Sequence, residues 1–498
     1  MFEPYAAYKA TAEQLSAVRS GRMDRVTHIV VVGGGPAGYE AALVAAQLAA
    51  EVTVVERDGL GGACVLYDCV PSKTFIATSE TMTAFRNAGT LGVRGLGVPS
   101  TGPADALVDT PVVHRRVKEL ARAQSQDVGR RLAHEGVRLV AGSGRFAADQ
   151  SGKATHRVEA VSADGSVQTL VADVVLLATG ASPRILPDAR PDGERILTWR
   201  EVYELPELPE HLIVVGSGVT GAEFASAYTE MGVRVTLVSS RDRVLPGEDA
   251  DAAAVLEHVF ADRGTEILKR ARASAVRRTE KGVLVEMEDG RAVEGSHALM
   301  TVGSVPNTTG LGLEHVGVTL GRGGFLEVDR VSRTGVPGVY AAGDCTGLLM
   351  LASVAAMQGR IAMWHALGEA VSPLRLKTVS ANVFTHPEIA TVGIQERAIK
   401  AGEVPARTVS LPLATNARAK MQGLREGFVK LFCRPATGVV IGGVVVAPYA
   451  SELILPVTIA VQNRLTVAQV ASSFSVYPSI SGSLTEAARR LMVHDDLD

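Results

Sequence analysis

The sequence has few cysteines, no strong excess of charge of either sign and no long apolar run. Four cysteines among 498 residues are too few for the disulfide framework of a secreted protein. A formal net charge of −3, without any basic block, gives no basis for a nucleic-acid partner. The longest apolar stretches, such as residues 438–450, fall short of the roughly 18 residues that a spanning helix needs. We therefore expect a cytoplasmic protein without a transmembrane segment.

The length and the apolar content indicate several domains. A chain of 498 residues that is 46% hydrophobic can bury more than one core. Residues 1–26 lack the continuous apolar core of a signal peptide, so we expect an N-terminal extension that is disordered. Met23 lies just before the first predicted strand, which leaves open whether translation starts at Met1 or at Met23.

Residues 61–73, GGACVLYDCVPSK, contain two of the four cysteines behind a glycine turn. A continuous helix would place the α-carbons of Cys64 and Cys69 roughly 8.6 Å apart, too far for an unstrained disulfide. A bond between them needs a distorted turn, and distortion makes a disulfide easier to reduce. Two ordinary core thiols are the alternative. Pro71, where the turn would end, and Lys73, about one helical turn beyond Cys69, favour a redox centre.

Residues 28–56 show the pattern of a strand, a glycine-rich turn, an alanine-rich helix and a second strand. Gly33 is expected to make the turn, Gly35 to let a pyrophosphate approach the backbone, and Gly38 to allow close packing of helix on strand. Glu56 ends the second strand, where a carboxylate accepts a hydrogen bond from a ribose hydroxyl. The complete pattern predicts a dinucleotide site, and a glycine-rich turn without function is the alternative.

Residues 212–238 repeat this pattern, with Gly216, Gly218 and Gly221 in the turn. Two such units in one chain predict electron transfer between two nucleotides. The second unit has no acid at the position that Glu56 occupies in the first.

The stretch that follows the second unit begins with Ser239 and contains Arg241 and Arg243. The missing acid removes repulsion of a 2′-phosphate, and the two arginines are positioned to neutralise it. This favours NADPH, or the use of both NADPH and NADH, over strict use of NADH. Surface arginines in an ordinary loop are the alternative.

Residues 61–73 resemble the active-site motif of the flavoprotein disulfide reductases, the family of dihydrolipoyl dehydrogenase, glutathione reductase and mercuric reductase. The resemblance covers nearly the whole chain. It implies that Cys64 exchanges with a substrate disulfide and that Cys69 contacts the flavin. It also implies that Lys73 lies near the flavin and pairs with Glu223.

The resemblance implies further FAD contacts along the chain. A turn at Thr179-Gly180 would lie against the cofactor, and Asp344 would hold its ribitol. A helix that begins at residues 350–352 would direct its positive N-terminus at the reduced flavin. The cofactor-binding residues predicted from the glycine patterns and from the resemblance are Gly33, Gly35, Ala37, Gly38, Glu56, Gly62, Lys73, Thr179, Gly180, Gly216, Gly218, Gly221, Ser239, Arg241, Arg243, Gly303, Asp344, Met350, Leu351 and Ala352.

The predicted fold is α/β, with two Rossmann-like dinucleotide-binding domains for FAD and NAD(P) and a C-terminal α+β dimerisation domain. The FAD domain is expected at residues 27–190 and 303–377, the NAD(P) domain at 191–302 and the dimerisation domain at 378–498. Long helices are expected at about 74–145, and strands at 383–393, 427–433 and 439–446. A homodimer follows from the resemblance.

The C-terminal end departs from the family pattern. In the reductases a His-Pro-Thr-x-x-Glu motif supplies an acid–base pair to the cysteines of the other subunit. Here Tyr477 stands at the histidine position and Gly482 at the glutamate position. General acid–base catalysis contributes typically 10²–10⁴-fold, and a tyrosine, with a reference pKa of about 10, is a poor replacement for histidine. We therefore expect exchange with lipoamide or glutathione disulfide to be impaired.

This combination resembles the dihydrolipoyl-dehydrogenase-like NAD(P)H quinone reductases. The resemblance implies an FAD enzyme that takes a hydride from NADPH or NADH and reduces a quinone, with catalytic residues Cys64, Cys69, Lys73, Glu223 and Tyr477 and without a metal. A disulfide reductase that uses the cysteine pair stays open as the alternative, because Cys64 is present. A soluble NAD(P) transhydrogenase and a non-enzymatic flavin-fold protein are minor alternatives.

Overall fold

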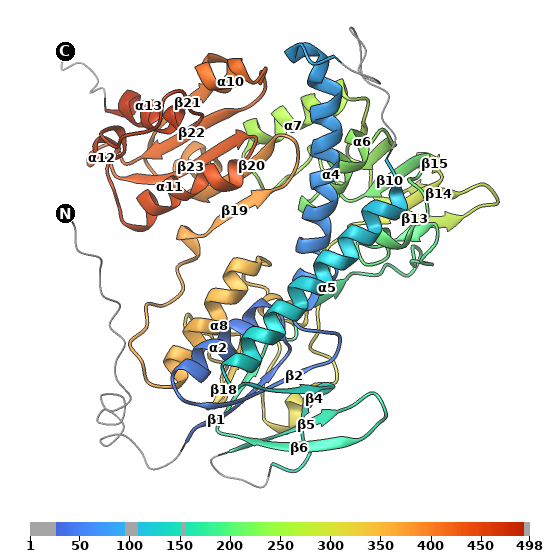
Figure 1. Ribbon diagram of the computed structural model, residues 1–498, viewed down its shortest axis with the longest axis vertical. Coiled ribbons are helices and arrows are strands. Elements are labelled where there is room, and N and C mark those ends of the chain that lie inside the picture. Colours follow the sequence, from blue (N-terminus) through green and yellow to red (C-terminus); the bar gives the residue numbers. More distant parts are fainter. Residues whose placement is uncertain (1–25, 95–107, 151–154, 493–498) are drawn as a thin grey trace.

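The computed structural model describes residues 26–94, 108–150 and 155–492 (Figure 1). The extension predicted at residues 1–26 lies outside these ranges apart from Val26. Within them, no helix combines the length and apolarity that crossing a membrane requires.

A parallel five-stranded sheet joins the N-terminal strands to a strand at residues 339–341. Its order is β18-β7-β1-β2-β3. Along β1, Ile29 and Val31 pack toward α2, while Val30 and Val32 pack toward a second, antiparallel sheet, as the alternation of a strand requires. The elements of this region are β1 (His28–Val32), α2 (Pro36–Gln47), β2 (Glu51–Glu56), β3 (Arg138–Ala141), β4 (Ser143–Phe146), β5 (His156–Val161), β6 (Val167–Ala172), β7 (Val174–Leu177), β18 (Val339–Ala341) and α8 (Ala352–Ala366).

A second parallel sheet, of order β12-β11-β10-β16-β9, repeats the design of the first. The Gly33 N–H donates to the Val55 carbonyl, and the Gly216 N–H donates to the Val238 carbonyl, both at 2.9 Å. The elements here are β9 (Ile196–Leu197), β10 (His211–Val215), α6 (Val219–Glu230), β11 (Arg234–Val238), α7 (Ala250–Asp262), β12 (Glu266–Leu268), β13 (Ala273–Arg278), β14 (Val283–Met287), β15 (Ala292–Gly295) and β16 (His297–Met300).

The chain crosses between the two parallel sheets through a two-stranded antiparallel ribbon of β8 (Ala181–Pro183) and β17 (Ser304–Pro306). Gly180 and Gly303 precede these strands with φ angles of +69° and +93°, which glycine adopts readily. We propose domain limits at 190/191 and 302/303, close to this ribbon, and at 377/378, just before the third sheet.

The third sheet is antiparallel, of order β19-β20-β23-β22-β21, and lies at the upper left of Figure 1. It shares one hydrophobic core with α4 (Cys69–Asn87) and α6, through side chains such as Phe75, Phe224 and Phe428. Its elements are β19 (Ser380–Val383), β20 (Glu388–Gly393), α9 (Glu396–Lys400), β21 (Arg407–Pro412), α10 (Ala417–Met421), β22 (Phe428–Cys433), β23 (Val440–Ala447), α11 (Ala450–Gln462), α12 (Val467–Ala471) and α13 (Gly482–Leu491).

The predicted fold class is confirmed, but two expected segments are wrong in detail. The long helices expected at 74–145 are α4 (Cys69–Asn87) and α5 (Thr110–His134), after which β3 and β4 begin. Gly136, with φ +75°, ends the second helix by directing its N–H back to Ala133. The strand expected at 383–393 is two strands, because residues 384–387 form the turn between β19 and β20.

Candidate active site

A cavity of about 380 Å³ lies at the carboxyl ends of the strands of the first parallel sheet. It extends from the end of β2 to the cysteine motif. The predicted site residues that line it are Gly33, Gly35, Ala37, Glu56, Gly62, Cys64, Cys69, Thr179, Gly180, Asp344, Met350 and Ala352. Of the other predicted FAD contacts, Gly38 lies behind the glycine turn, and Leu351 is the N-cap residue of α8.

Three backbone segments approach one another closely at the glycine turn, because glycine has no side chain. The backbone there stays accessible to a ligand. A Cβ at Gly38 would lie 1.9 Å from the Gly33 carbonyl oxygen, so only glycine lets α2 pack on β1 here. A Cβ at Gly62 would lie 2.9 Å from the Cα of Gly35. The start of α3 (Gly62–Leu66) therefore meets the turn backbone to backbone, which fits a flat pyrophosphate at a helix N-terminus.

Glu56 organises the far end of the cavity. One carboxylate oxygen accepts from the Gly34 N–H at 2.6 Å, and the other accepts from the N–H groups of Asp58 and Gly59 at 2.6 and 3.2 Å. A carboxylate has about four acceptor positions, so it retains capacity for a ribose hydroxyl. The predicted role of Glu56 is compatible with this geometry.

The cysteine motif is two helices rather than one. The first, α3, ends at Leu66, and α4 begins at Cys69; between them the N–H groups of Tyr67 and Asp68 both donate to the Ala63 carbonyl. This break confirms the predicted distorted turn. It brings the thiols into hydrogen-bonding contact: the contact with Cys69 lowers the pKa of Cys64, and the same contact raises the pKa of Cys69.

Lys73 and Glu223 form the predicted pair, which joins α4 to α6. The Lys73 Nζ lies 2.8 Å from one carboxylate oxygen of Glu223 and 4.7 Å from the centre of the Phe384 ring. The other oxygen accepts from the Phe384 N–H at 2.9 Å. Burial is the largest single influence and lowers the pKa of Lys73, but the negative charges of Glu223, Cys69 and Asp68 together outweigh burial and raise the pKa of the ammonium. The pair holds a fixed cation beside the second cysteine.

Asp344 follows β18 and projects into the same cavity. Burial, and secondly the nearby charge of Asp68, raise the pKa of its carboxyl to about 6. Neither carboxyl oxygen receives a hydrogen bond from the described residues. A half-buried acceptor that faces a cavity without a donor can accept hydrogen bonds from a ligand, so this position fits a polyol hydroxyl such as those of ribitol.

The second glycine turn has the same geometry as the first. A Cβ at Gly221 would lie 1.9 Å from the Gly216 carbonyl oxygen, while a Cβ at Gly218 would meet nothing within 4 Å. The equivalent hydrogen bonds of Gly33 and Gly216 make Ser239 the structural counterpart of Glu56. The prediction that the second unit lacks the ribose-binding acid is confirmed at this position.

The structure gives Ser239 and Arg243 roles within their own loop. Ser239 is fully buried; its hydroxyl bonds to Ser217 at 2.7 Å and accepts from the Arg241 N–H at 3.1 Å. The Arg243 guanidinium donates to the carbonyls of Pro246 and Glu248 at 3.0 and 3.2 Å. Arg241 is exposed, and its side chain has no partner within the described ranges. Of the three, it is the residue best placed for a phosphate.

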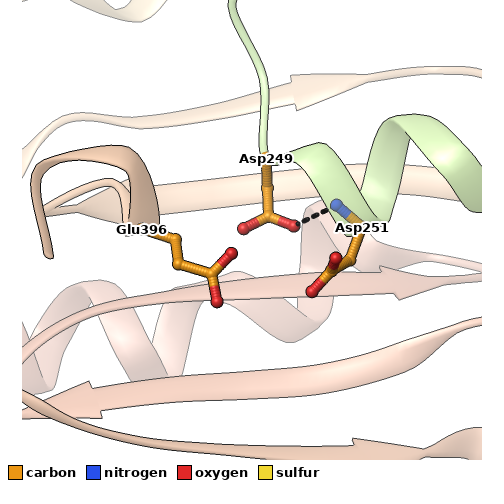
Figure 2. Close-up of side chains that lie close together, drawn as sticks. All are labelled: Asp249, Asp251 and Glu396. Atoms are coloured by element: carbon orange, nitrogen blue, oxygen red, sulfur yellow. Dashed lines mark hydrogen bonds between the residues drawn. The ribbon is translucent and has the colours of Figure 1, made fainter. Parts of the chain in front are cut away.

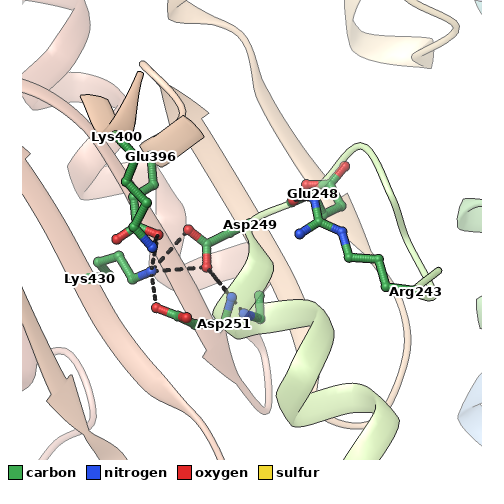
Figure 3. A network of polar contacts seen from close by, with 8 residues as sticks. Arg243, Glu248, Asp249, Asp251, Glu396, Lys400 and Lys430 are labelled. Atoms are coloured by element: carbon green, nitrogen blue, oxygen red, sulfur yellow. Dashed lines mark hydrogen bonds and ion pairs between the residues drawn. The ribbon is translucent and has the colours of Figure 1, made fainter. Parts of the chain in front are cut away.

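Three carboxylates that could suggest a metal site surround a lysine instead. Oxygens of Asp249, Asp251 and Glu396 lie within 4.8 Å of one another (Figure 2). The buried Lys430 Nζ lies among them, at 3.0, 2.6 and 3.2 Å respectively (Figure 3). Its ammonium already supplies the positive charge that these acids require. The cluster joins the start of α7 to β22 and α9.

Comparison with known proteins places the chain in a family. Residues 27–359 match the pyridine nucleotide-disulphide oxidoreductases, and residues 379–488 match the dimerisation domain of the same enzymes.

The chain belongs to the pyridine nucleotide-disulphide oxidoreductase family.

Two relatives and one solved structure are similar to the chain over most of its length. The chain is 65% identical over 476 residues to the NAD(P)H dehydrogenase (quinone) of Mycobacterium tuberculosis, with 95% of each chain covered. It is 34% identical over 465 residues to the dihydrolipoyl dehydrogenase of Chlorobaculum tepidum, with 92% of this chain and 96% of the relative covered. The crystal structure of LpdA from Mycobacterium tuberculosis matches with a TM-score of 0.89 at 64% identity, over 94% of this chain and 100% of LpdA.

Tyr477 does not line the cavity of its own chain. It precedes α13 and its residue surface is 84% exposed, as are those of Phe474 and Val476 at 106% and 78%. Gly482 begins α13 and has no side chain to offer a proton carrier. Within the described part of the chain, no histidine or glutamate of this segment replaces the acid–base pair of the disulfide reductases.

The predicted site residues leave out several polar residues that line the cavity, among them Asp68, Arg200 and Asn307. Asn307 donates to the Thr179 carbonyl at 2.9 Å and accepts from Ser182 at 2.8 Å, and its place after residues 303–306 was a usable signal. Arg200 lies over the Tyr67 ring at 4.8 Å, and nothing in its sequence context marks it. Asp68 is the one acid of residues 61–73, but only the structure shows that its side chain makes no capping hydrogen bond.

Proposed function

We propose that this protein is an FAD-dependent NAD(P)H:quinone oxidoreductase. One combination of features carries the proposal. The dinucleotide and cysteine site is intact, but Tyr477 and Gly482 stand at the positions of the acid–base pair. The 65% identity to a protein named NAD(P)H dehydrogenase (quinone), over nearly the full length of both chains, supports it. Exchange with a disulfide substrate needs a proton carrier that titrates near neutral pH, whereas passage of electrons to a quinone does not depend on that group.

The residues that would hold FAD fit the group. Gly33, Gly35 and the start of α2 would bind the pyrophosphate, Glu56 the adenosine ribose and Asp344 the ribitol. Bound FAD supplies two-electron chemistry, in which a hydride is received from a nicotinamide and electrons are passed to an acceptor. Lys73, held by Glu223, would place positive charge beside it and favour an anionic reduced form.

NADPH is the proposed donor, with NADH accepted. The second glycine turn would bind its pyrophosphate through Gly216 and Gly218, with Gly221 allowing α6 to pack closely. Since the counterpart of Glu56 is the buried Ser239, no carboxylate repels a 2′-phosphate there, and Arg241 is free to contact it.

The working form is proposed to be a homodimer. The chain carries the dimerisation domain of its family. Phe474, Val476 and Tyr477 expose apolar and aromatic surface next to one another, which a second copy of the chain would cover. Sedimentation equilibrium would give twice the mass of the chain; a monomer at micromolar concentration would contradict this part of the proposal.

Replacing Cys64 by serine tests the electron acceptor. Quinone reduction should survive Cys64→Ser largely intact, whereas turnover of a disulfide would be abolished because the attacking sulfur is lost. Steady-state rates with menadione, benzoquinone, lipoamide and glutathione disulfide, on both proteins, would separate the two activities. Cys433→Ser, a buried thiol in β22, is the matched control. Robust lipoamide turnover that disappears in Cys64→Ser would show a disulfide reductase instead.

That disulfide reductase is the second candidate, and one observation favours keeping it. The thiols of Cys64 and Cys69 contact each other in the structure, so the pair is arranged to form and break a bond. Such a pair could store two electrons even where a quinone is the final acceptor. Thiol titration after anaerobic addition of NADPH would show whether electrons reach it.

A further inference from the structure

Asp68 lies at the break between α3 and α4, directly before Cys69, and lines the same cavity as both cysteines. An aspartate at the N-cap position normally accepts hydrogen bonds from the first turn of its helix. Here the backbone of Asp68 is at φ −121° and ψ −93°, and its side chain makes no capping hydrogen bond. Helix capping therefore does not account for this carboxyl group.

Asp68 has no hydrogen-bonding partner for its carboxyl group among the described residues either. The ammonium of Lys73 is already paired with another carboxylate: its Nζ lies 2.8 Å from an oxygen of Glu223. Burial raises the pKa of Asp68; Lys73 lowers it, and Glu223 adds to the rise. The titratable groups that interact with Asp68 are Cys64 on α3, Cys69 and Lys73 on α4, Glu223 on α6, Tyr203 before β10, and Asp344 after β18.

From this placement we propose that Asp68 is the proton-holding group of the Cys64–Cys69 pair, in the place left by the missing histidine and glutamate. The inference rests on the proposed function only in that a pyridine nucleotide is the physiological reductant. A carboxyl group that lines the same cavity as two thiols and has no hydrogen-bonding partner among the described residues is the arrangement that internal proton transfer needs.

The proton balance assigns Asp68 one defined step. Reduction of a Cys64–Cys69 disulfide by NADPH adds two electrons and one proton, which yields one thiol and one thiolate. Asp68 as the carboxylic acid gives its proton to the thiolate, leaving a carboxylate and two thiols. On reoxidation, two electrons and one proton leave with the acceptor, and the second proton returns to Asp68.

Thiol titration of Asp68→Asn tests the proposal. The holoenzyme is reduced with a phosphine, so that the result is readable even if NADPH or quinone activity fails. Alkylation of each cysteine by iodoacetamide is then followed by mass spectrometry across pH. Because the carboxylate raises the pKa of Cys64, its removal should lower the alkylation midpoint by roughly one pH unit, about tenfold in rate below the midpoint. Asp68→Glu should restore the wild-type profile.

Glu80→Gln is the matched control. Glu80 lies on the same helix, also has a raised pKa caused first by burial, and faces Glu388 and Glu230 rather than the cysteines. Its removal should leave the alkylation profile unchanged. If Asp68→Asn gives the same profile as the wild type and Glu80→Gln, the proposal is wrong.

Infrared difference spectra of oxidised and phosphine-reduced enzyme provide a second readout on the wild type, which decides the matter even if Asp68→Asn does not fold. A band of a protonated carboxyl group should change on reduction, move in Asp68→Glu and be lost in Asp68→Asn. A shifted alkylation profile without any such band would show Asp68 to be a fixed charge that never carries the proton, and would overturn the proposal.

Discussion

At the scale of single residues, the proposed preference for NADPH depends on which charges at the second glycine turn are free to contact a phosphate. Ser239 and Arg243 form their hydrogen bonds within the second glycine turn and the loop that follows it. Arg241, in contrast, is exposed and has no side-chain partner in the described part of the chain. A guanidinium that binds a phosphate forms a charge-assisted contact, while one that holds backbone carbonyls only shapes the loop. Discrimination between NADPH and NADH should therefore reside mainly in Arg241.

Replacing Arg241 by alanine should weaken the use of NADPH more than that of NADH. A lost hydrogen bond to a charged group costs about 1.5–3 kcal/mol, or roughly ten- to a hundredfold in kcat/KM. The measurement is kcat/KM for both nucleotides with one quinone. Arg277→Ala is the control, because Arg277 is an exposed arginine of the same region paired with Glu286 at 2.8 Å. Equal losses for both nucleotides would leave Arg241 a surface charge without selectivity.

The sequence predicted the types of residue in the site better than their partners. Cys64, Cys69, Glu56 and Asp344 line one cavity as expected, because glycine spacing and strand ends determine where such residues lie. It could not predict that Arg243 turns back to Pro246, since that contact depends on the path of a loop. Asp68 was missed for the same reason: only the three-dimensional break between α3 and α4 shows that its carboxyl group caps nothing.

At the scale of elements, each dinucleotide unit depends on two glycines with different duties. In the second unit, Gly221 lets α6 pack against the turn, because a Cβ there would lie 1.9 Å from the Gly216 carbonyl oxygen. Gly218, with φ −74°, has open space where its Cβ would be. Gly221 therefore serves internal packing, and Gly218 serves access of a ligand to the backbone.

Alanine at these two glycines should therefore have separable effects. Gly221→Ala should destabilise the protein by about 1–3 kcal/mol, as overpacking does, and also weaken NADPH binding. Gly218→Ala should leave stability nearly unchanged and raise the KM for NADPH, because its methyl group would occupy the approach of the pyrophosphate. Thermal unfolding and steady-state kinetics measure the two effects. FAD content should stay constant in both variants, and a loss of stability in Gly218→Ala would contradict the assignment of duties.

Element boundaries were predicted well where a local signal exists and poorly where a turn decides. The first strand, the glycine turn and α2 follow directly from residues 28–47. The helix predicted to run to residue 145 ends at His134, since Gly136 adopts a left-handed conformation that its sequence context does not force. The separation of β19 from β20 is likewise set by their antiparallel pairing, in which Val383 lies opposite Ile389.

At the scale of the whole molecule, the buried Lys430 joins the third sheet to the start of α7. Its ammonium is 1% exposed and contacts three carboxylates, of which Asp249 also caps α7 by accepting from the N–H groups of Asp251 and Ala252 (Figure 3). Burial alone would lower the pKa of Lys430, but its hydrogen bonds to Asp251 and Asp249 raise it. The charge is therefore maintained inside the protein by acids from another region of the chain.

Replacing Lys430 by methionine should destabilise the protein strongly. The apolar stem keeps its length, but the buried Asp249 carboxylate loses its cation, and breaking such a buried pair costs about 3–5 kcal/mol. Glu396 keeps its ion pair with Lys400. The free energy of unfolding, from denaturant titration monitored by FAD release and by circular dichroism, measures this. Lys400→Met is the matched control: its side chain is 64% exposed and also pairs with Glu396, so it should change stability by less than about 1 kcal/mol.

The same cluster predicts a pH dependence whose sign follows from its pKa shifts. The hydrogen bond from Lys430 lowers the pKa of Asp251 below its ordinary value of 3.8, so its stabilisation is present above that pH and is lost as the pH falls through the lower folded value. The raised pKa of Lys430 keeps its contribution present throughout neutral pH. The stability difference between wild type and Lys430→Met should stay level from about pH 5 to 8 and shrink below about pH 4. A difference that instead grows on acidification would show that Asp251 is not held ionised by Lys430.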